Sequence, residues 1–153
     1  MGTDEILPKL TRGTLGVVPA ASCEWVIMCD NAMVDQNGKP TLVGLFEQFT
    51  GPSAPLQIVS AFVVVRLRGA NGQPTSRVRI DLTGPNDQRL VEVEGDVEFK
   101  AQAATNMNIS LGGLILPDFG RYTVSVWLDG APAAGMVFDA VQNPPAASGP
   151  QST

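Results

Sequence analysis

The sequence predicts an all-β protein, an antiparallel two-sheet β-sandwich of immunoglobulin-like type with about eight strands. Three observations lead to this prediction. Apolar and polar residues alternate with a period of two, most clearly over Leu90–Phe99. Short turn signals such as Asp129-Gly130 separate these runs. The motif Asp118-x-Gly120-x-Tyr122 has the spacing of a tyrosine corner, in which a tyrosine hydroxyl bonds to the backbone upstream.

Three strands are expected in the first half of the chain, over Glu24–Val34, Thr41–Phe49 and Ile58–Arg68. Glu24–Val34 is apolar on both alternating sides, which is typical of a strand covered on both faces. Asn37-Gly38 predicts a hairpin between the first two strands. The prolines and glycine of Thr50–Leu56 predict a loop that crosses to the third strand.

Five strands are expected in the second half, over Val78–Leu82, Leu90–Phe99, Thr105–Leu111, Tyr122–Leu128 and Met136–Ala140. A turn through Asn71-Gly72 leads from the strand Ile58–Arg68 into the first of them. Gly95 interrupts the inward-facing valines of Leu90–Phe99, so we expect a bulge or a close backbone approach there.

The domain organisation follows from this pattern. We expect an N-terminal arm over residues 1–22, either flexible or docked on the body, and a β-sandwich domain over residues 23–141. Residues 142–153 are rich in proline, alanine and serine, which predicts a disordered tail.

Composition excludes several function classes. The 153 residues include no histidine, which removes Ser-His-Asp and Cys-His catalysis and histidine-ligated metal sites. The net charge of −5, without a basic run, argues against binding to nucleic acid or to an anionic membrane. We therefore predict that the protein is not an enzyme and carries no cofactor.

The two cysteines indicate a reducing compartment. On one strand Cys23 and Cys29 would lie about 20 Å apart, too far for a disulfide. A reactive thiolate needs a cationic neighbour, which neither has in the sequence, so an inert buried Cys29 is favoured. Asp4 and Glu5 stand where a signal peptide has basic residues. We expect a cytoplasmic protein.

An acidic row on one predicted strand, Glu92, Glu94, Asp96 and Glu98, is a candidate calcium site. Calcium sites, however, gather oxygens from converging loops and not from one straight strand. Cross-strand pairing is favoured, with Arg77 and Arg79 beside the acids and Arg66 and Arg68 one strand further on. We predict no metal site.

Trp127 lies on the side of its strand opposite to Tyr122, Val124 and Val126. It is either an exposed aromatic anchor of an interface or a residue covered by the arm or a loop. The candidate interaction surface combines uncharged polar residues of two strands, if these are neighbours, with this tryptophan: Asn106, Asn108, Thr123, Ser125 and Trp127. The alternative is an ordinary solvated sheet face.

Cys29-Asp30, the turn Gly38-Lys39 and the strand Leu42–Phe46 resemble a family of small bacterial domains of unknown function. The closing segment Pro117–Tyr122, with its Pro-x-x-Gly-x-Tyr pattern, resembles that family too. The resemblance spans about residues 25–141. It implies a β-sandwich and brings no catalytic residues.

These observations favour a non-enzymatic β-sandwich interaction module that binds a protein partner or associates with itself into an oligomer. One alternative is a structural subunit of a phage or capsid-like assembly, laced together by its arms. A second alternative is a sandwich that binds a small ligand or a carbohydrate.

Overall fold

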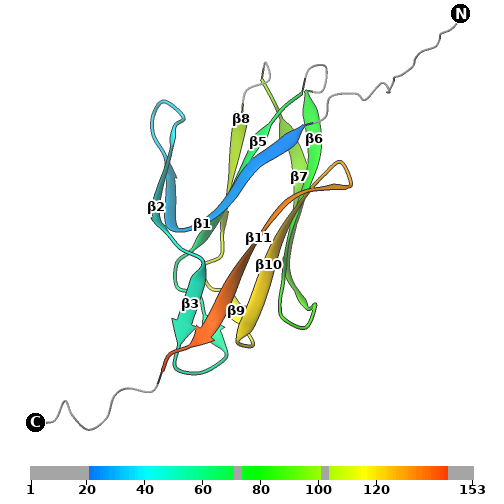
Figure 1. Cartoon of the computed structure of the whole chain (residues 1–153). Coiled ribbons are helices and arrows are strands. Elements are labelled where there is room, and N and C mark those ends of the chain that lie inside the picture. The colour runs from blue at the N-terminus through cyan, green and yellow to red at the C-terminus, as the bar shows by residue number, and fades with distance from the viewer. Residues whose placement is uncertain (1–20, 71–73, 101–103, 145–153) are drawn as a thin grey trace, which may run out of the picture.

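The computed structural model of the chain describes residues 21–70, 74–100 and 104–144, and these residues form an all-β fold (Figure 1). They contain eleven strands, against the eight that the sequence predicts. Within these ranges, no helix is long and apolar enough to cross a membrane. The predicted arm and tail fall largely outside the described residues, although Ser22 already belongs to the first strand and Gln142 to the last.

One of the two larger sheets has four strands in the order β2-β1-β5-β8. All its neighbours are antiparallel. Its strands are β1 (Ser22–Val34), β2 (Pro40–Leu45), β5 (Phe62–Arg68) and β8 (Ala104–Ser110). The β1–β2 hairpin projects beyond the other strands in Figure 1.

The second larger sheet has five strands in the order β3-β11-β10-β6-β7. Only the β3–β11 pair is parallel. Its strands are β3 (Gln48–Gly51), β6 (Thr75–Thr83), β7 (Arg89–Glu98), β10 (Gly120–Leu128) and β11 (Ala131–Gln142). A further small sheet pairs β4 (Leu56–Gln57) with β9 (Ile115–Leu116).

Both larger sheets contribute side chains to one hydrophobic core. Val63, Val65 and Leu67 enter it from the four-stranded sheet. The five-stranded sheet contributes a larger group, with Val78, Ile80, Leu82, Tyr122, Val124, Val126 and Phe138. The alternating residues of each strand therefore define an inner face toward this core and an outer face away from it.

The tyrosine corner is confirmed. The Tyr122 hydroxyl donates a hydrogen bond to the Asp118 carbonyl at 2.7 Å and accepts one from the Asp118 amide at 3.3 Å. The ring is fully buried and stacks on Phe138 with centroids 5.2 Å apart. Desolvation by burial raises the pKa of this tyrosine.

Both predicted hairpin turns are present as well. Asp129 and Gly130 have positive φ values of 51° and 83°, the backbone twist that suits a two-residue hairpin. In the first hairpin, Asp35 Oδ1 accepts the amides of Asn37 and Lys39, each at 2.8 Å.

The predicted strand Thr41–Phe49 is wrong as a single element. Gly44 adopts φ +72°, and the chain leaves the first sheet after Leu45. It continues as β3, which pairs in parallel with β11 of the other sheet. The alternation changes phase between Phe46 and Phe49, with Glu47 and Gln48 in between. Such a phase change does not reveal to which sheet the next strand belongs.

Two further expectations are wrong. The strand Ile58–Arg68 is not a neighbour of the strand that follows it, since β5 pairs with β1 and β8 while β6 lies in the other sheet. The predicted turn through Asn71-Gly72 itself falls on residues 71–73, outside the described residues. Gly95 lies in regular register with Val78, and a Cβ atom built on it would meet nothing within 4 Å. The register shift between β6 and β7 lies instead at Leu82/Thr83.

Candidate functional site

The outer face of the four-stranded sheet carries a continuous set of apolar side chains. Pairing aligns Leu45, Cys29 and Phe62 across β2, β1 and β5. The next row aligns Ile27 with Val64. We call the following residues the apolar outer face: Trp25, Ile27, Cys29, Leu45, Phe62 and Val64.

Burial at the centre of this face is complete although the main core lies on the other side of the sheet. Cys29 and Val64 are both 0% exposed, yet neither belongs to the main core cluster. Large neighbours on the same face cover them, because Ile27 and Phe62 flank each of these positions in the register. The sheet thus has a second, thinner apolar layer outside the core.

The projecting β1–β2 hairpin extends this apolar layer. On the same face as Cys29, Met33 is 48% exposed, Val43 47% and Leu45 63%, whereas Val34, 57% exposed, lies on the opposite face of the hairpin. β2 has no charged residue, and it is an edge strand with no further strand beside it. Edge strands usually carry charges or other features that prevent pairing, so an uncharged apolar edge is a surface suited to contact with another molecule.

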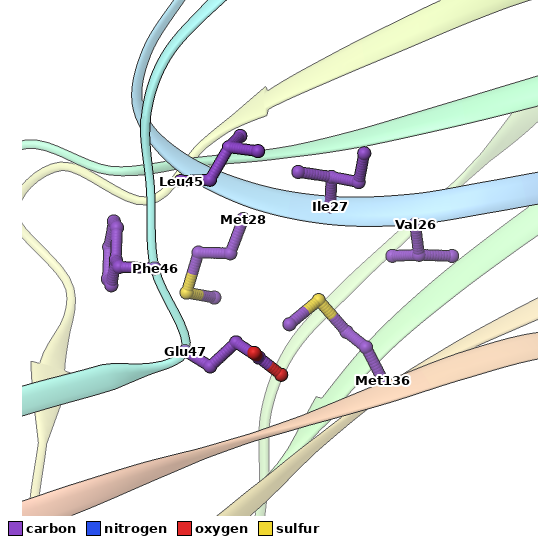
Figure 2. A pocket seen from close by; sticks show the side chains of 7 residues that line it. All are labelled: Val26, Ile27, Met28, Leu45, Phe46, Glu47 and Met136. Carbon is purple, nitrogen blue, oxygen red and sulfur yellow. The ribbon is translucent and has the colours of Figure 1, made fainter.

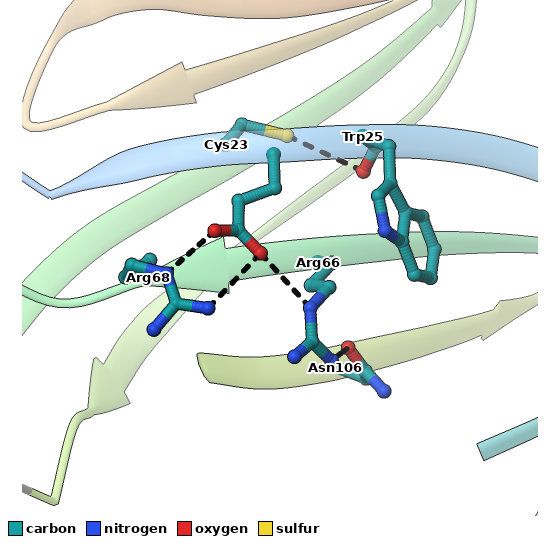
Figure 3. Close-up of polar contacts among 6 residues, drawn as sticks. Cys23, Trp25, Arg66, Arg68 and Asn106 are labelled. Carbon is teal, nitrogen blue, oxygen red and sulfur yellow. Dashed lines mark hydrogen bonds and ion pairs between the residues drawn. The ribbon is translucent and has the colours of Figure 1, made fainter. Parts of the chain in front are cut away.

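A polar rim borders the apolar outer face at the opposite end of β1 (Figure 3). Glu24 accepts hydrogen bonds from Arg66 Nε at 2.9 Å and from Arg68 Nε at 2.5 Å. Arg66 Nη1 also donates to Asn106 Oδ1 at 3.2 Å. Hydrogen bonding to Arg68, and then to Arg66, lowers the pKa of the Glu24 carboxyl.

A β-bulge places two rim residues side by side. The register shifts between Cys23 and Trp25, so Glu24 is the extra residue of β1. Cys23 packs toward the core, while Glu24 bonds to the outward arginines and Trp25 lies opposite Arg66. The bulge therefore brings a carboxylate and an indole to the same face.

Trp127, a residue of the predicted surface, lies on the outer face of the other sheet. It is partly buried, and the guanidinium carbon of Arg79 lies 4.5 Å from its ring centroid. Its indole nitrogen is buried and finds no hydrogen-bond acceptor among the described residues. Among the described residues, Arg79 of the neighbouring strand β6 thus supplies a covering side chain, whereas the predicted arm over residues 1–22 lies largely outside the described residues.

The predicted polar face does not exist as one surface. Asn106 and Asn108 lie on β8, at the edge of the four-stranded sheet, whereas Thr123 and Ser125 lie on β10, inside the five-stranded sheet. The condition that their strands be neighbours is therefore not met. Asn106 joins the rim of the apolar outer face through Arg66, and Asn108 lies across from Val64.

The acidic row of β7 is paired in part as predicted. Arg77 contacts Glu94 at 3.3 Å and Asp96 at 3.2 Å. Arg79 instead pairs with Asp81 of its own strand, at 3.3 Å. Arg66 and Arg68 lie in the other sheet and bond to Glu24, so the expectation that they extend this pairing is wrong.

Cys23 and Cys29 are both free and lie on β1. Desolvation by burial raises the pKa of each thiol. A raised pKa keeps both thiols protonated near neutral pH, which disfavours nucleophilic chemistry. Within the described ranges, no three His, Cys, Asp or Glu side chains are grouped so that they could hold a metal ion.

A groove of about 270 Å³ lies where β1 approaches β11 (Figure 2). Val26, Met28, Phe46 and Met136 line its apolar part, and Glu47 adds a carboxylate. Figure 2 shows Ile27 and Leu45 on the other side of β1 from Met28. The groove therefore has apolar lining from both sides of β1: Val26 and Met28 lie on the inner side, and Ile27 and Leu45 belong to the apolar outer face.

Sequence reasoning singled out Trp127 and missed Trp25, Phe62 and the exposed hairpin. A signal for them was present, since Glu24–Val34 is apolar on both sides of the strand. Such a strand requires cover on both faces. Among the described residues, the main core covers the inner face of this strand, and no second sheet covers its outer face.

The fold and this face define an all-β protein with an uncharged apolar surface on one sheet and a hydrogen-bonded rim. The chain belongs to a family of unknown function (DUF6941), whose model matches residues 24–141. The predicted membership in a family of unknown function is thereby confirmed. No curated protein matches the chain significantly.

Proposed function

We propose that the protein is a non-enzymatic interaction module and that the apolar outer face, with the projecting β1–β2 hairpin, binds a protein partner. The observation that carries this proposal is the continuous apolar layer on the side of β1 and β5 that faces away from the core. Interface centres are rich in aromatic residues, methionine and arginine and poor in lysine and glutamate. Trp25, Phe62, Met33 and Arg66 fit that composition.

The arrangement of rim and centre supports the same function. Binding energy in interfaces concentrates in buried aromatic and arginine anchors surrounded by residues that exclude water. Here Trp25 lies between an apolar centre and the Glu24–Arg66–Arg68 ion pairs. Both arginines are already oriented by Glu24, which reduces the side-chain entropy lost on binding.

The scaffold behind this face is, we infer, a two-sheet sandwich of immunoglobulin-like type. The core shared by the two larger sheets and the Tyr122–Asp118 corner support this. A rigid sandwich suits a binding module, because its faces hold side chains in fixed positions.

A pair of photo-crosslinking variants tests the function. A photoreactive amino acid replaces either Leu45 on the apolar outer face or Val137 on the outer face of the other sheet; both side chains are exposed, by 63% and 42%. We expect defined protein adducts in an extract of the source cells from position 45 only. Equal labelling from both positions, or no adduct from position 45, would contradict the proposal.

A further inference from the structure

We infer that the partner of the apolar outer face is a second copy of this chain, packed face to face about a two-fold axis. This inference rests on the proposed function and names its partner. A two-fold contact uses the same patch on both subunits, so the patch has to be complementary to itself. Three features of this face meet that condition.

The first feature is the distribution of charge. The whole sequence has a net charge of −5, so two copies repel each other. The strands of the four-stranded sheet together have no net charge, because Glu24 and Asp30 are balanced by Arg66 and Arg68. The strands of the other sheet have a net charge of −2, because six acids (four of them Glu92, Glu94, Asp96 and Glu98 on β7) outnumber four arginines. A copy of the same acidic chain therefore meets least repulsion at the apolar outer face.

The second feature is the chemistry of the rim. Glu24 supplies a carboxylate, Arg66 and Arg68 supply guanidinium groups, and Asn106 supplies an amide. The rim thus contains both donors and acceptors at neighbouring positions. In a pair whose two-fold axis passes near the rim, the carboxylate of one copy lies near the guanidinium groups of the other, an attraction that a rim of a single charge would not allow.

The third feature is the hairpin. The hairpin projects beyond the other strands (Figure 1), and its side chains Met33 and Val43 are exposed, as is Leu45 where β2 ends. An aliphatic surface on a projecting element is covered when a neighbouring molecule packs against it. In a face-to-face pair, each hairpin extends the contact past the edge of its own sheet.

Sedimentation velocity of the full chain over a concentration series tests this inference. The probe variants are Leu45→Lys on the apolar outer face and Val137→Lys on the other sheet, which add the same charge at exposed aliphatic positions. We expect the wild type and Val137→Lys to form dimers, and Leu45→Lys to raise the dissociation constant by about tenfold or more. A dissociation constant of about 1 mM already corresponds to weak binding. A wild type that stays monomeric up to that protein concentration would therefore overturn the inference.

The emission wavelength of Trp25, followed over protein concentration, distinguishes dimer formation from misfolding. Trp127→Phe leaves Trp25 as the sole tryptophan, and its emission should shift to shorter wavelength as the dimer forms. The same variant carrying Leu45→Lys should keep its emission unchanged over that concentration range. A dimer that forms without any change at Trp25, or that Leu45→Lys does not weaken, would place the contact elsewhere and overturn the inference.

The two proposals fail separately. If the chain is monomeric but position 45 crosslinks to a different protein, the second-copy inference falls and the proposed function stands. If the chain is monomeric and position 45 yields no adduct, both fall.

Discussion

Tyr122 and Glu24 show how single side chains fix local geometry in this molecule. Tyr122 is fully buried, and its hydroxyl exchanges two hydrogen bonds with the backbone of Asp118. Glu24 forms ion pairs with two arginines on the outer face of the four-stranded sheet, which faces away from the core. One residue anchors a loop against the interior, and the other organises a surface.

Replacing Tyr122 by phenylalanine should destabilise the protein by about 1 kcal/mol. The ring and its stacking on Phe138 remain, whereas the Asp118 amide and carbonyl lose their partner. Urea unfolding at neutral pH measures the loss. A change below about 0.3 kcal/mol would mean that water replaces the hydroxyl without cost.

Replacing Glu24 by glutamine should reduce stability in a pH-dependent way. The pKa of Glu24 is lowered in the folded state, so its contribution is present above its ordinary value of 4.5 and is lost as pH falls through the lowered pKa. Urea unfolding should therefore show wild type more stable than Glu24→Gln at pH 7. The difference should shrink as the pH falls below 4.5 and through the lowered pKa. A difference independent of pH would contradict an ionic role.

One glycine in β7 and one at the start of β10 show that glycine has different roles in different strands. Gly95 lies within β7, opposite Val78, with open space where a Cβ atom would be. Gly120 begins β10 at φ +137°, and a Cβ atom there would lie 2.7 Å from Pro85 Cγ. Only the second position requires glycine.

Replacing Gly95 by alanine should stabilise the protein by about 0.5–1 kcal/mol, because alanine loses less backbone entropy on folding. Gly120→Ala is the matched control and should destabilise it through strain and the clash with Pro85. Thermal and urea unfolding of both variants provide the measurement. If Gly95→Ala destabilised the protein, the result would contradict the open space at this position and favour the close backbone approach predicted from the sequence.

At the scale of the whole molecule, charge and apolar surface are segregated. The acidic strand β7 lies at one edge of the five-stranded sheet, while the apolar outer face lies on β1, β2 and β5 of the four-stranded sheet, whose strands together have no net charge. Repulsion between acidic bodies therefore opposes association, and apolar burial favours it. The balance between the two depends on ionic strength.

Raising the salt concentration should strengthen self-association. At 0.01 M ionic strength the Debye length is about 30 Å and the acidic bodies repel, whereas at 0.15 M it falls to about 8 Å. The dissociation constant from sedimentation should fall between these conditions for the wild type and for Val137→Lys. Weaker association at higher salt would indicate a contact made chiefly by ion pairs.

The local features of this protein can be predicted from its amino-acid sequence alone. The all-β class, the hairpin turns and the tyrosine corner follow from alternation, turn residues and a short spacing, all of which depend on near neighbours in the chain. The paired β6–β7 acids and arginines were predictable for the same reason. The sequence also indicates a second buried face, because Glu24–Val34 is apolar on both sides of the strand.

Which strands share a sheet depends on contacts between residues far apart in the chain. Alternation says that a strand has two faces but not which neighbours complete them, so the separation of Asn106 from Thr123 and the crossings after Leu45 and Arg68 could not be predicted. These long-range pairings place Trp25, Phe62 and Leu45 on one surface and Trp127 on another. The candidate binding face exists because β1, β2 and β5 are neighbours, and contacts between residues far apart in the chain fix that arrangement.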